Sequence, residues 1–227
     1  MRHFTVNDVP AVVWTPDGPA GPLIFIGHGG GEHKTAPEIV RYAGRFTAAG
    51  FTVVSADVPN HGDRPYDADL DRKATAMRAR VDAGENLAVA IAAFQDEVSR
   101  QTVGEWRAVL DHLGAERVGY WGVSLGCGLG VPFVAAEPRV RAAVLGLGGG
   151  SANAATAARI SVAVRFVIAW DDERIPRDSS LTLFDAFGAP EKSLHAHPGR
   201  HSDPLPDQEL DAQVAFFSRH LLTHPQG

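Results

Sequence analysis

The sequence has a single cysteine, no long hydrophobic segment and no excess of positive charge. Because Cys127 stands alone among 227 residues, an intramolecular disulfide and a multi-cysteine metal site are both excluded. The longest strongly apolar run, residues 87–94, is far shorter than the roughly 20 residues that span a bilayer. The net charge of -6 disfavours a nucleic-acid-binding surface, which needs a basic face. We therefore expect no membrane span and no nucleic-acid partner.

The start of the chain also lacks the features of a secretory signal. Residues 1–16 contain no sustained apolar segment, so we expect a cytoplasmic protein. Hydrophobic residues make up 44% and charged residues 21%, which is typical of soluble globular proteins. A length of 227 residues suffices for one domain with a sizeable core and is short for two. We expect a single domain over residues 1–227, and nothing in the pattern indicates an oligomeric state.

Short apolar runs recur at the spacing of alternating strands and helices. Strands are expected as a pair within 4–16 and then at 23–27, 51–59, 117–123, 140–147, 165–170 and, more weakly, 192–198. Helices are expected at 37–50, 106–114, after Ser124, and at 180–188 and 209–222. This alternation predicts an α/β fold with a mostly parallel sheet that is covered by helices on both faces.

Residues 64–100 interrupt this alternation. The segment is polar and rich in alanine, with scattered apolar residues at positions such as Met77 and Phe94. It predicts a small helical insertion after the fourth strand, outside the sheet. The insertion is a candidate lid over an active site, and an extended surface helix pair without a gating role is the alternative.

The candidate nucleophile is Ser124, at the centre of the motif Gly-Val-Ser-Leu-Gly at residues 122–126. A serine on a sharp strand-to-helix turn adopts strained backbone angles, and glycines two residues away on either side avoid collisions there. The apolar run 117–123 precedes the motif, and the small-residue stretch 126–130 follows it. This context favours a reactive serine over a merely structural turn.

The second glycine-rich stretch, His28-Gly29-Gly30-Gly31, directly follows the predicted strand at 23–27. Its position resembles that of the oxyanion loop of lipases and esterases. We predict the N–H groups of Gly30 and Leu125 as the oxyanion donors, and Gly31 as a further candidate. His28 itself is expected to be structural.

An acid and a base complete such a site. The strand at 165–170 ends in Asp171 and Asp172, and we favour Asp172 because the Asp-x-x-hydrophobic-Pro pattern beginning there resembles that of esterases. Among the histidines of residues 195–204, we favour His201, which follows a Pro-Gly loop start, and keep His197 in reserve.

With these motifs in the order Ser, Asp, His, the chain resembles the α/β-hydrolase superfamily, and it is most similar to dienelactone-hydrolase-like serine esterases. The resemblance covers residues 10–222 and implies an α/β-hydrolase fold and hydrolysis of a small-molecule ester through an acyl-enzyme. It implies a triad of Ser124, Asp172 and His201 and neither a metal nor an organic cofactor. One departure is the serine, since dienelactone hydrolases proper use a cysteine nucleophile.

Other readings remain open on the sequence alone. His61 and Arg64 could line the mouth of the site and bind substrate, although loop-fixing hydrogen bonds are the simpler role. A non-catalytic ligand receptor on the same fold, or a peptidase or thioesterase with the same triad, is the alternative function. A dinucleotide site at the glycines of 144–155 is disfavoured, because too few strands follow it.

Overall fold

The computed structural model describes residues 1–85, 88–150 and 153–222, and these form one eight-stranded sheet flanked by helices. The strand order is β1-β2-β4-β3-β5-β6-β7-β8. β2 pairs antiparallel with β1 and β4, and all the other neighbours are parallel. The predicted mostly parallel α/β sheet is therefore confirmed. The strands are β1 (Arg2–Val6), β2 (Val9–Trp14), β3 (Leu23–Gly27), β4 (Thr52–Ala56), β5 (Val118–Val123), β6 (Val140–Gly146), β7 (Ala163–Ala169) and β8 (Lys192–His197).

The first two strands form a hairpin whose turn follows from its sequence. Asn7 and Asp8 have φ angles of 48° and 64°, and Val6 pairs with Val9 across the turn. Asparagine and aspartate tolerate this left-handed region better than most residues, and a turn with two such residues matches the twist of paired strands. The hairpin adds an antiparallel edge to the parallel sheet.

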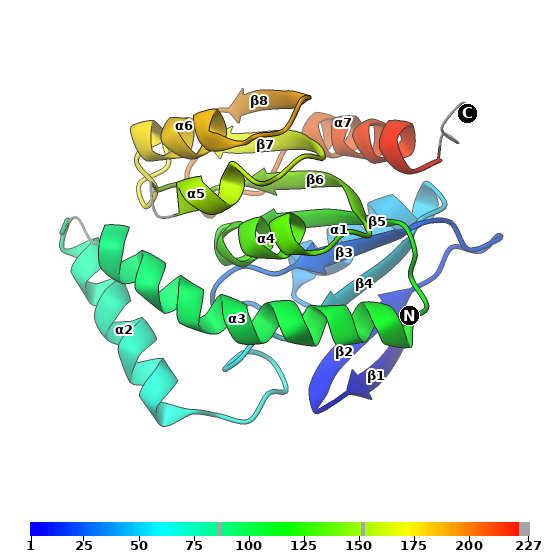
Figure 1. Cartoon of the computed structure of the whole chain (residues 1–227), viewed down its shortest axis with the longest axis horizontal. Coiled ribbons are helices and arrows are strands. Elements are labelled where there is room, and N and C mark those ends of the chain that lie inside the picture. The colour runs from blue at the N-terminus through cyan, green and yellow to red at the C-terminus, as the bar shows by residue number, and fades with distance from the viewer. Residues whose placement is uncertain (86–87, 151–152, 223–227) are drawn as a thin grey trace.

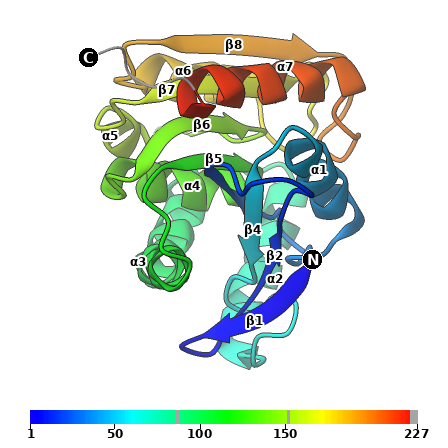
Figure 2. The same cartoon turned by 90° about the vertical axis from the view of Figure 1, so that its right-hand side faces the viewer.

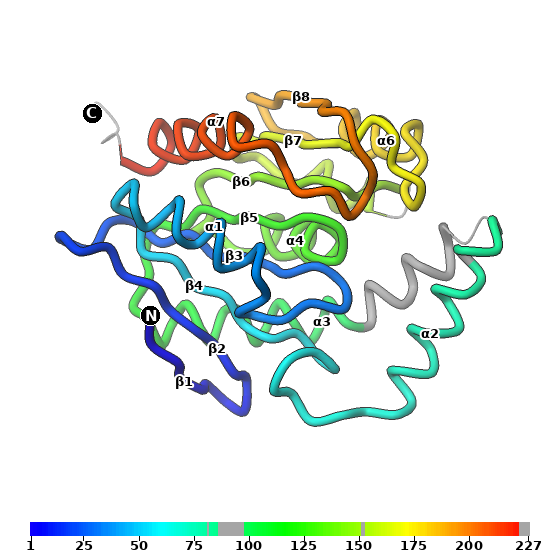
Figure 3. The backbone as a smooth tube through the Cα atoms, turned by 180° about the vertical axis from the view of Figure 1, so that it is seen from behind, coloured from blue at the N-terminus to red at the C-terminus, as the bar shows by residue number. Residues whose placement is uncertain are grey.

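Helices cover both faces of the sheet, as Figures 1 and 2 show. α1 and α7 lie on one face, where they are nearest the viewer in the view from behind (Figure 3). α3, α4, α5 and α6 lie on the other face. The helices are α1 (Pro37–Ala48), α2 (Ala68–Asp82), α3 (Ala88–His112), α4 (Leu125–Ala136), α5 (Ala154–Ala157), α6 (Arg177–Ala186) and α7 (Asp207–Phe217), with a π-helical turn at Ser218–Leu222.

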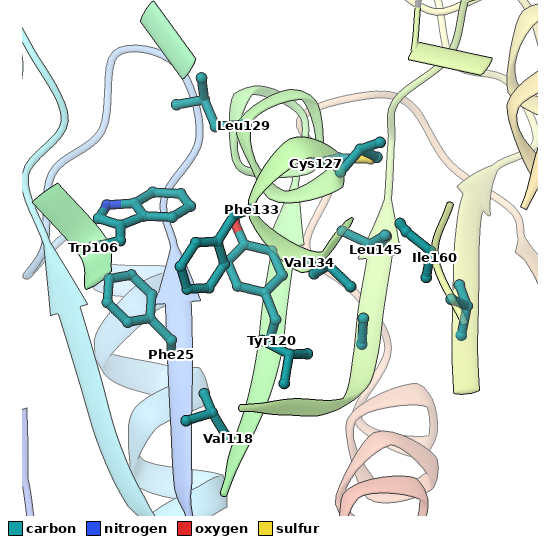
Figure 4. Close-up of a cluster of buried hydrophobic side chains, with 14 of the residues drawn as sticks. Phe25, Trp106, Val118, Tyr120, Cys127, Leu129, Phe133, Val134, Leu145 and Ile160 are labelled. Atoms are coloured by element: carbon teal, nitrogen blue, oxygen red, sulfur yellow. The ribbon is translucent and has the colours of Figure 1, made fainter. Parts of the chain in front are cut away.

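Each central strand contributes side chains to two separate cores. In β3, Ile24 and Ile26 face α1 and α7, whereas Phe25 packs on the opposite face with Trp106 and Tyr120. Figure 4 shows part of this second core, built where α3 and α4 meet the sheet. Because successive strand residues point to opposite faces, a strand covered on both faces has a continuous apolar sequence. That is the pattern on which the strand at 23–27 was predicted.

The segment after β4 forms α2 and the long helix α3. α2 lies outside the sheet (Figures 1 and 3). The predicted end of the insertion at residue 100 is wrong, since α3 continues without a break to His112 and includes the helix expected at 106–114. Its last turns bury Thr102, Trp106 and Val109 against the core. The side chains of residues 86–97 lie outside the description, so the lid remains a prediction.

None of the described helices is both long enough and apolar enough to cross a membrane.

Candidate active site

Ser124 lies at a strained turn between β5 and α4. Its φ of 55° and ψ of -120° are unusual for a residue with a side chain, and such strain collects at functional sites. The surrounding backbone holds the turn in place. The N–H of Ser124 donates to Gly146 O at 2.9 Å, and its carbonyl oxygen accepts from the N–H groups of Cys127 and Gly128 at 3.0 Å each.

The two motif glycines are required for two different reasons. A Cβ on Gly122 would lie 2.5 Å from the carbonyl oxygen of Gly126, across the turn, which is the collision that the motif avoids. A Cβ on Gly126 would instead collide with the carbonyl oxygen of Gly27, at the end of β3. The second glycine therefore lets α4 approach the neighbouring strand, and this contact sets the distance between Ser124 and the loop after β3.

The predicted serine, histidine and aspartate lie together in one hydrogen-bonded chain. Ser124 Oγ is 2.9 Å from His201 Nε2, and His201 Nδ1 is 2.8 Å from Asp172 Oδ2. The side chains of His201 and Asp172 are each only 6% exposed. Because a carboxylate accepts and does not donate, Nδ1 carries the proton and Nε2 is free to accept from the hydroxyl. This is the protonation state that a general base requires.

Backbone hydrogen bonds hold the carboxylate of Asp172 in position beside His201. Its Oδ1 accepts the N–H groups of Arg174 and Ile175, each at 2.8 Å. Burial raises the pKa of the Asp172 carboxyl, but hydrogen bonds from His201, Ile175 and Arg174 outweigh burial and bring the pKa below its ordinary value. The carboxylate is therefore charged at neutral pH and can stabilise a cationic imidazole.

The competing acid and base candidates lie elsewhere. Asp171 is exposed, and its N–H donates to Gly199 O. His197 is buried at the end of β8 and directs Nδ1 to the carbonyl oxygen of Pro198. Within the described chain, neither residue has a hydrogen bond to His201 or Ser124.

In the loop after β3, one backbone N–H group near the serine has no hydrogen-bond acceptor among the described residues. Gly29 N–H donates to Glu32 Oε2 at 2.8 Å, and Gly31 N–H donates to His61 Nε2 at 3.2 Å. Among the described residues, the N–H groups of Gly30 and Leu125 have no acceptor. A Cβ built on Gly30 would lie 3.9 Å from the Cβ of Leu125, so the two residues are neighbours. These are the two donors predicted for an oxyanion, whereas Gly31 is already engaged.

The buried His28 stabilises this loop through hydrogen bonds to two backbone groups. Its Nε2 accepts the N–H of Val58 at 3.2 Å, and its Nδ1 therefore donates to Gly29 O at 2.9 Å. Burial lowers the pKa of His28 to about 4, so the ring is neutral at physiological pH. It has the structural environment predicted for it.

The two residues proposed to line the mouth make contacts within the protein. His61 donates from Nδ1 to Pro59 O and accepts the N–H of Gly31. Arg64 forms an ion pair with Glu105 of α3 at 2.7 Å, and both side chains are largely buried. These contacts connect the loop after β4 to the loop after β3 on one side and to α3 on the other.

An ion-pair network around the buried Lys34 and Asp57 joins the same loops to the exposed Asp63, and the sequence did not reveal it. Lys34 Nζ lies 2.6 Å from both Asp57 Oδ2 and Asp63 Oδ2, and Asp57 Oδ1 also accepts the N–H of Lys34 at 2.8 Å. Lys34 and Asp57 are 23 positions apart, so no local pattern pairs them. The network joins the loop after β3 to the loop after β4. Within the described ranges, no three His, Cys, Asp or Glu side chains could hold a metal ion.

Comparison with known proteins gives a family and a fold. The model of the dienelactone hydrolase family matches residues 9–202. No curated protein matches the sequence. A cold-adapted esterase from an Arctic intertidal metagenomic library is 30% identical, with a TM-score of 0.77 over 97% of this chain and 92% of the esterase.

Two more distant structures share the fold. Est1E from Butyrivibrio proteoclasticus, solved with ferulic acid, is 15% identical, with a TM-score of 0.73 over 98% of this chain and all of Est1E (100%). A dienelactone hydrolase from Anabaena variabilis is 17% identical, with a TM-score of 0.64 over 97% of this chain and 98% of that enzyme.

Proposed function

The chain belongs to the dienelactone hydrolase family and has the fold of ester-cleaving α/β-hydrolases, and we propose on this premise that it is a serine esterase. Its substrates are carboxylic esters of small or medium size, cleaved through an acyl-enzyme. The observation that carries the proposal is the continuous chain of hydrogen bonds from Ser124 through His201 to Asp172.

In the first half-reaction, Ser124 Oγ attacks the carbonyl carbon of the ester while its proton passes to His201 Nε2. Gly30 and Leu125 donate their N–H groups to the oxyanion that forms. The ester C–O bond then breaks, and His201 returns the proton to the leaving alcohol. Asp172 stabilises the imidazolium between these two transfers, and the acyl group remains on Ser124.

In the second half-reaction, water attacks the acyl carbon and gives its proton to His201 Nε2. The same two N–H groups stabilise the second oxyanion. The bond to Ser124 Oγ breaks, the serine recovers the proton, and the carboxylic acid leaves. The two half-reactions together consume one ester and one water molecule and release an alcohol and a carboxylic acid.

Cys127 does not replace the serine in this scheme. It is fully buried, and burial raises the pKa of its thiol to about 12, so almost no thiolate forms at neutral pH. Its side chain packs against Gly148, where a Cβ would lie only 2.6 Å from the Cys127 Sγ. The residue therefore has a packing role in α4, consistent with a serine nucleophile.

The proposal also assigns the residues around the nucleophile. His61 and Arg64 hold the mouth of the site through Gly31 and Glu105, and they affect substrate binding through these contacts.

The proposal is tested by labelling with a fluorophosphonate probe and by turnover of p-nitrophenyl esters from acetate to decanoate. We expect labelling at Ser124, with turnover of short esters that is lost in Ser124→Ala. A folded wild-type protein that neither labels nor turns over any ester would contradict the esterase and favour a ligand receptor. Faster cleavage of amides or thioesters than of matched esters would favour the peptidase or thioesterase.

The two aspartates provide a matched pair for the same assay. Asp172→Asn should lower kcat by roughly 10⁴, because an amide there favours the wrong tautomer of the histidine. Asp171→Asn should leave kcat close to that of the wild type, since only its backbone contacts the histidine loop. The reverse result would move the acid by one residue.

A further inference from the structure

The loop that carries His201 is tied to the end of β7. The N–H of Trp170 donates to His197 O at 2.8 Å, and the N–H of Asp171 donates to Gly199 O at 3.0 Å. These backbone bonds end at Gly199, whose φ of 128° is open mainly to glycine. Arg200 lies between this tie and the histidine, and its N–H donates to Asp203 Oδ2 at 2.7 Å.

Glu173 supplies the next tie, and it does so with a side chain. One of its carboxylate oxygens, Oε2, accepts the backbone N–H of His201 at 3.1 Å. Two consecutive carboxylates therefore hold the same residue, since Asp172 holds the ring and Glu173 holds the main chain. Arg200 Nε lies 3.6 Å and Arg174 Nε 3.9 Å from the Glu173 carboxylate.

The carboxylate is charged under ordinary conditions. Its own backbone N–H and the N–H of His201 both donate to it, and these hydrogen bonds lower the pKa of Glu173. A charged acceptor makes a stronger hydrogen bond to an N–H than a neutral one does. The contact can therefore keep its geometry although Glu173 is partly exposed to solvent.

We propose that Glu173 is a positioning residue, which fixes the main chain of His201 and thereby the place of its imidazole between Ser124 and Asp172. The inference rests on the proposed function. The ring must meet two partners at once, at 2.9 Å and 2.8 Å, so a small shift of its main chain breaks one of the two bonds. Misplacement of a catalytic group by about 1 Å can cost up to a hundredfold in rate.

Two substitutions separate the hydrogen bond from the charge. Glu173→Ala removes the acceptor, and we expect kcat for a short p-nitrophenyl ester to fall about tenfold while KM changes less than about twofold. Glu173→Gln keeps an oxygen that can accept the same N–H, and it should recover most of kcat. All assays are run well below the melting transition of each variant, so a loss of stability alone does not lower kcat.

Glu191→Ala is the matched control. Glu191 is a partly exposed carboxylate that forms an ion pair with Arg219. It lies just before β8, and the whole of that strand separates it from the loop of His201. We expect its removal to leave kcat unchanged. Equal kcat in wild type, Glu173→Ala and Glu173→Gln would overturn the inference, as would an equal loss in both Glu173 variants.

A second measurement does not depend on activity. The His201 Nδ1 proton, which is hydrogen-bonded to Asp172, should give a low-field NMR signal in the wild type and in Glu173→Gln and lose it in Glu173→Ala. Persistence of the signal in Glu173→Ala would overturn the inference. If the wild type neither labels nor hydrolyses esters, the proposed function fails, and this signal still decides the role of Glu173.

Discussion

Two histidines near the site, His28 and His201, show how the partners of a ring decide what it can do. His201 lies between a hydroxyl and a carboxylate, so a proton that reaches its ring is stabilised by the charge of Asp172. His28 is buried between backbone groups, with Val58 N–H on one nitrogen and Gly29 O beyond the other. No carboxylate is hydrogen-bonded to it in the described chain, and its cation is correspondingly unfavourable.

The buried neutral His28 predicts a loss of stability in mild acid. Its pKa is lowered from 6.5 to about 4 in the folded protein, so between these values the unfolded chain binds more protons. Stability therefore falls as the pH drops through 6.5 and stops falling near 4. From this one group, the free energy of unfolding should decrease by about 2 kcal/mol between pH 8 and pH 5.

Urea denaturation of wild type and His28→Gln at both pH values measures this effect. Glutamine does not titrate in this range, and its side-chain oxygen can accept the N–H of Val58. The difference in unfolding free energy between the two proteins should thus change by about 2 kcal/mol from pH 8 to pH 5. A constant difference would mean that the pKa of His28 is the same in the folded and unfolded protein, and that burial does not lower it.

The sequence predicted which residues gather at the site better than it predicted how they are held. Ser124, Asp172 and His201 lie together as expected, because each ends or follows a strand and parallel strands end at one edge. Their catalytic roles remain proposals. The contacts of Gly31 with His61 and of Lys34 with Asp57 join different loops, and such partners are selected by packing rather than by local sequence.

At the scale of elements, the turn at Ser124 depends on how closely α4 approaches the sheet. Tyr120 of β5 donates its hydroxyl to Gly126 O at 2.6 Å, and its ring occupies space that a Cβ on Gly130 would fill. Gly126 itself lies against Gly27 of β3. Gly27, Gly126 and Gly130 thus allow α4, β3 and the buried Tyr120 to pack closely behind the serine. The pattern Gly-x-Ser-x-Gly alone does not predict this packing.

This arrangement predicts a sharp contrast between two glycine substitutions. Gly126→Ala should lower the free energy of unfolding by about 2 kcal/mol, because its Cβ meets the rigid carbonyl of Gly27. The displaced α4 should also move Leu125 away from Gly30 and lower kcat. Gly44→Ala, on α1 with open space around it, should raise the free energy of unfolding by about 1 kcal/mol.

Thermal and urea unfolding of the two variants, with ester turnover, check this contrast. Equal stability of Gly126→Ala and wild type would mean that α4 can move away from β3 without cost. A loss of stability in Gly44→Ala would indicate that α1 does not have the open surface described for it.

Helix boundaries were the least predictable part of the elements. The sequence marks a helix at 106–114 by its apolar spacing, but α3 begins at Ala88 and passes Gly104 without a break. A glycine inside a helix costs only about 1 kcal/mol relative to alanine. Burial of Trp106 and Val109 against the sheet outweighs that cost, and this burial is a tertiary effect that local spacing does not contain.

At the scale of the whole molecule, one sheet joins two cores that do not touch each other. Trp106 belongs to the core beneath α3 and α4, and Trp121 belongs to the core beneath α1 and α7. Trp121 lies on β5 beside Tyr120, which faces the other core. Any loss of β5 therefore removes support from both layers at once, and we propose that residues 1–227 form a single cooperative domain.

Fluorotryptophan incorporation and ¹⁹F NMR test this cooperativity directly, because each tryptophan reports on its own layer. The native signals of Trp106 and Trp121, assigned by Trp→Phe variants, should disappear at the same urea concentration, because β5 contributes side chains to both layers. Trp170 is 49% exposed at the end of β7 and serves as a third probe. If the signal of Trp106 disappears first, the layer of α3 and α4 unfolds on its own, and the single-domain proposal is wrong. A common midpoint for all three signals would mean that the strands of the sheet couple the elements holding Ser124, His201 and the loop after β3. The candidate site would then be lost only when the whole domain unfolds.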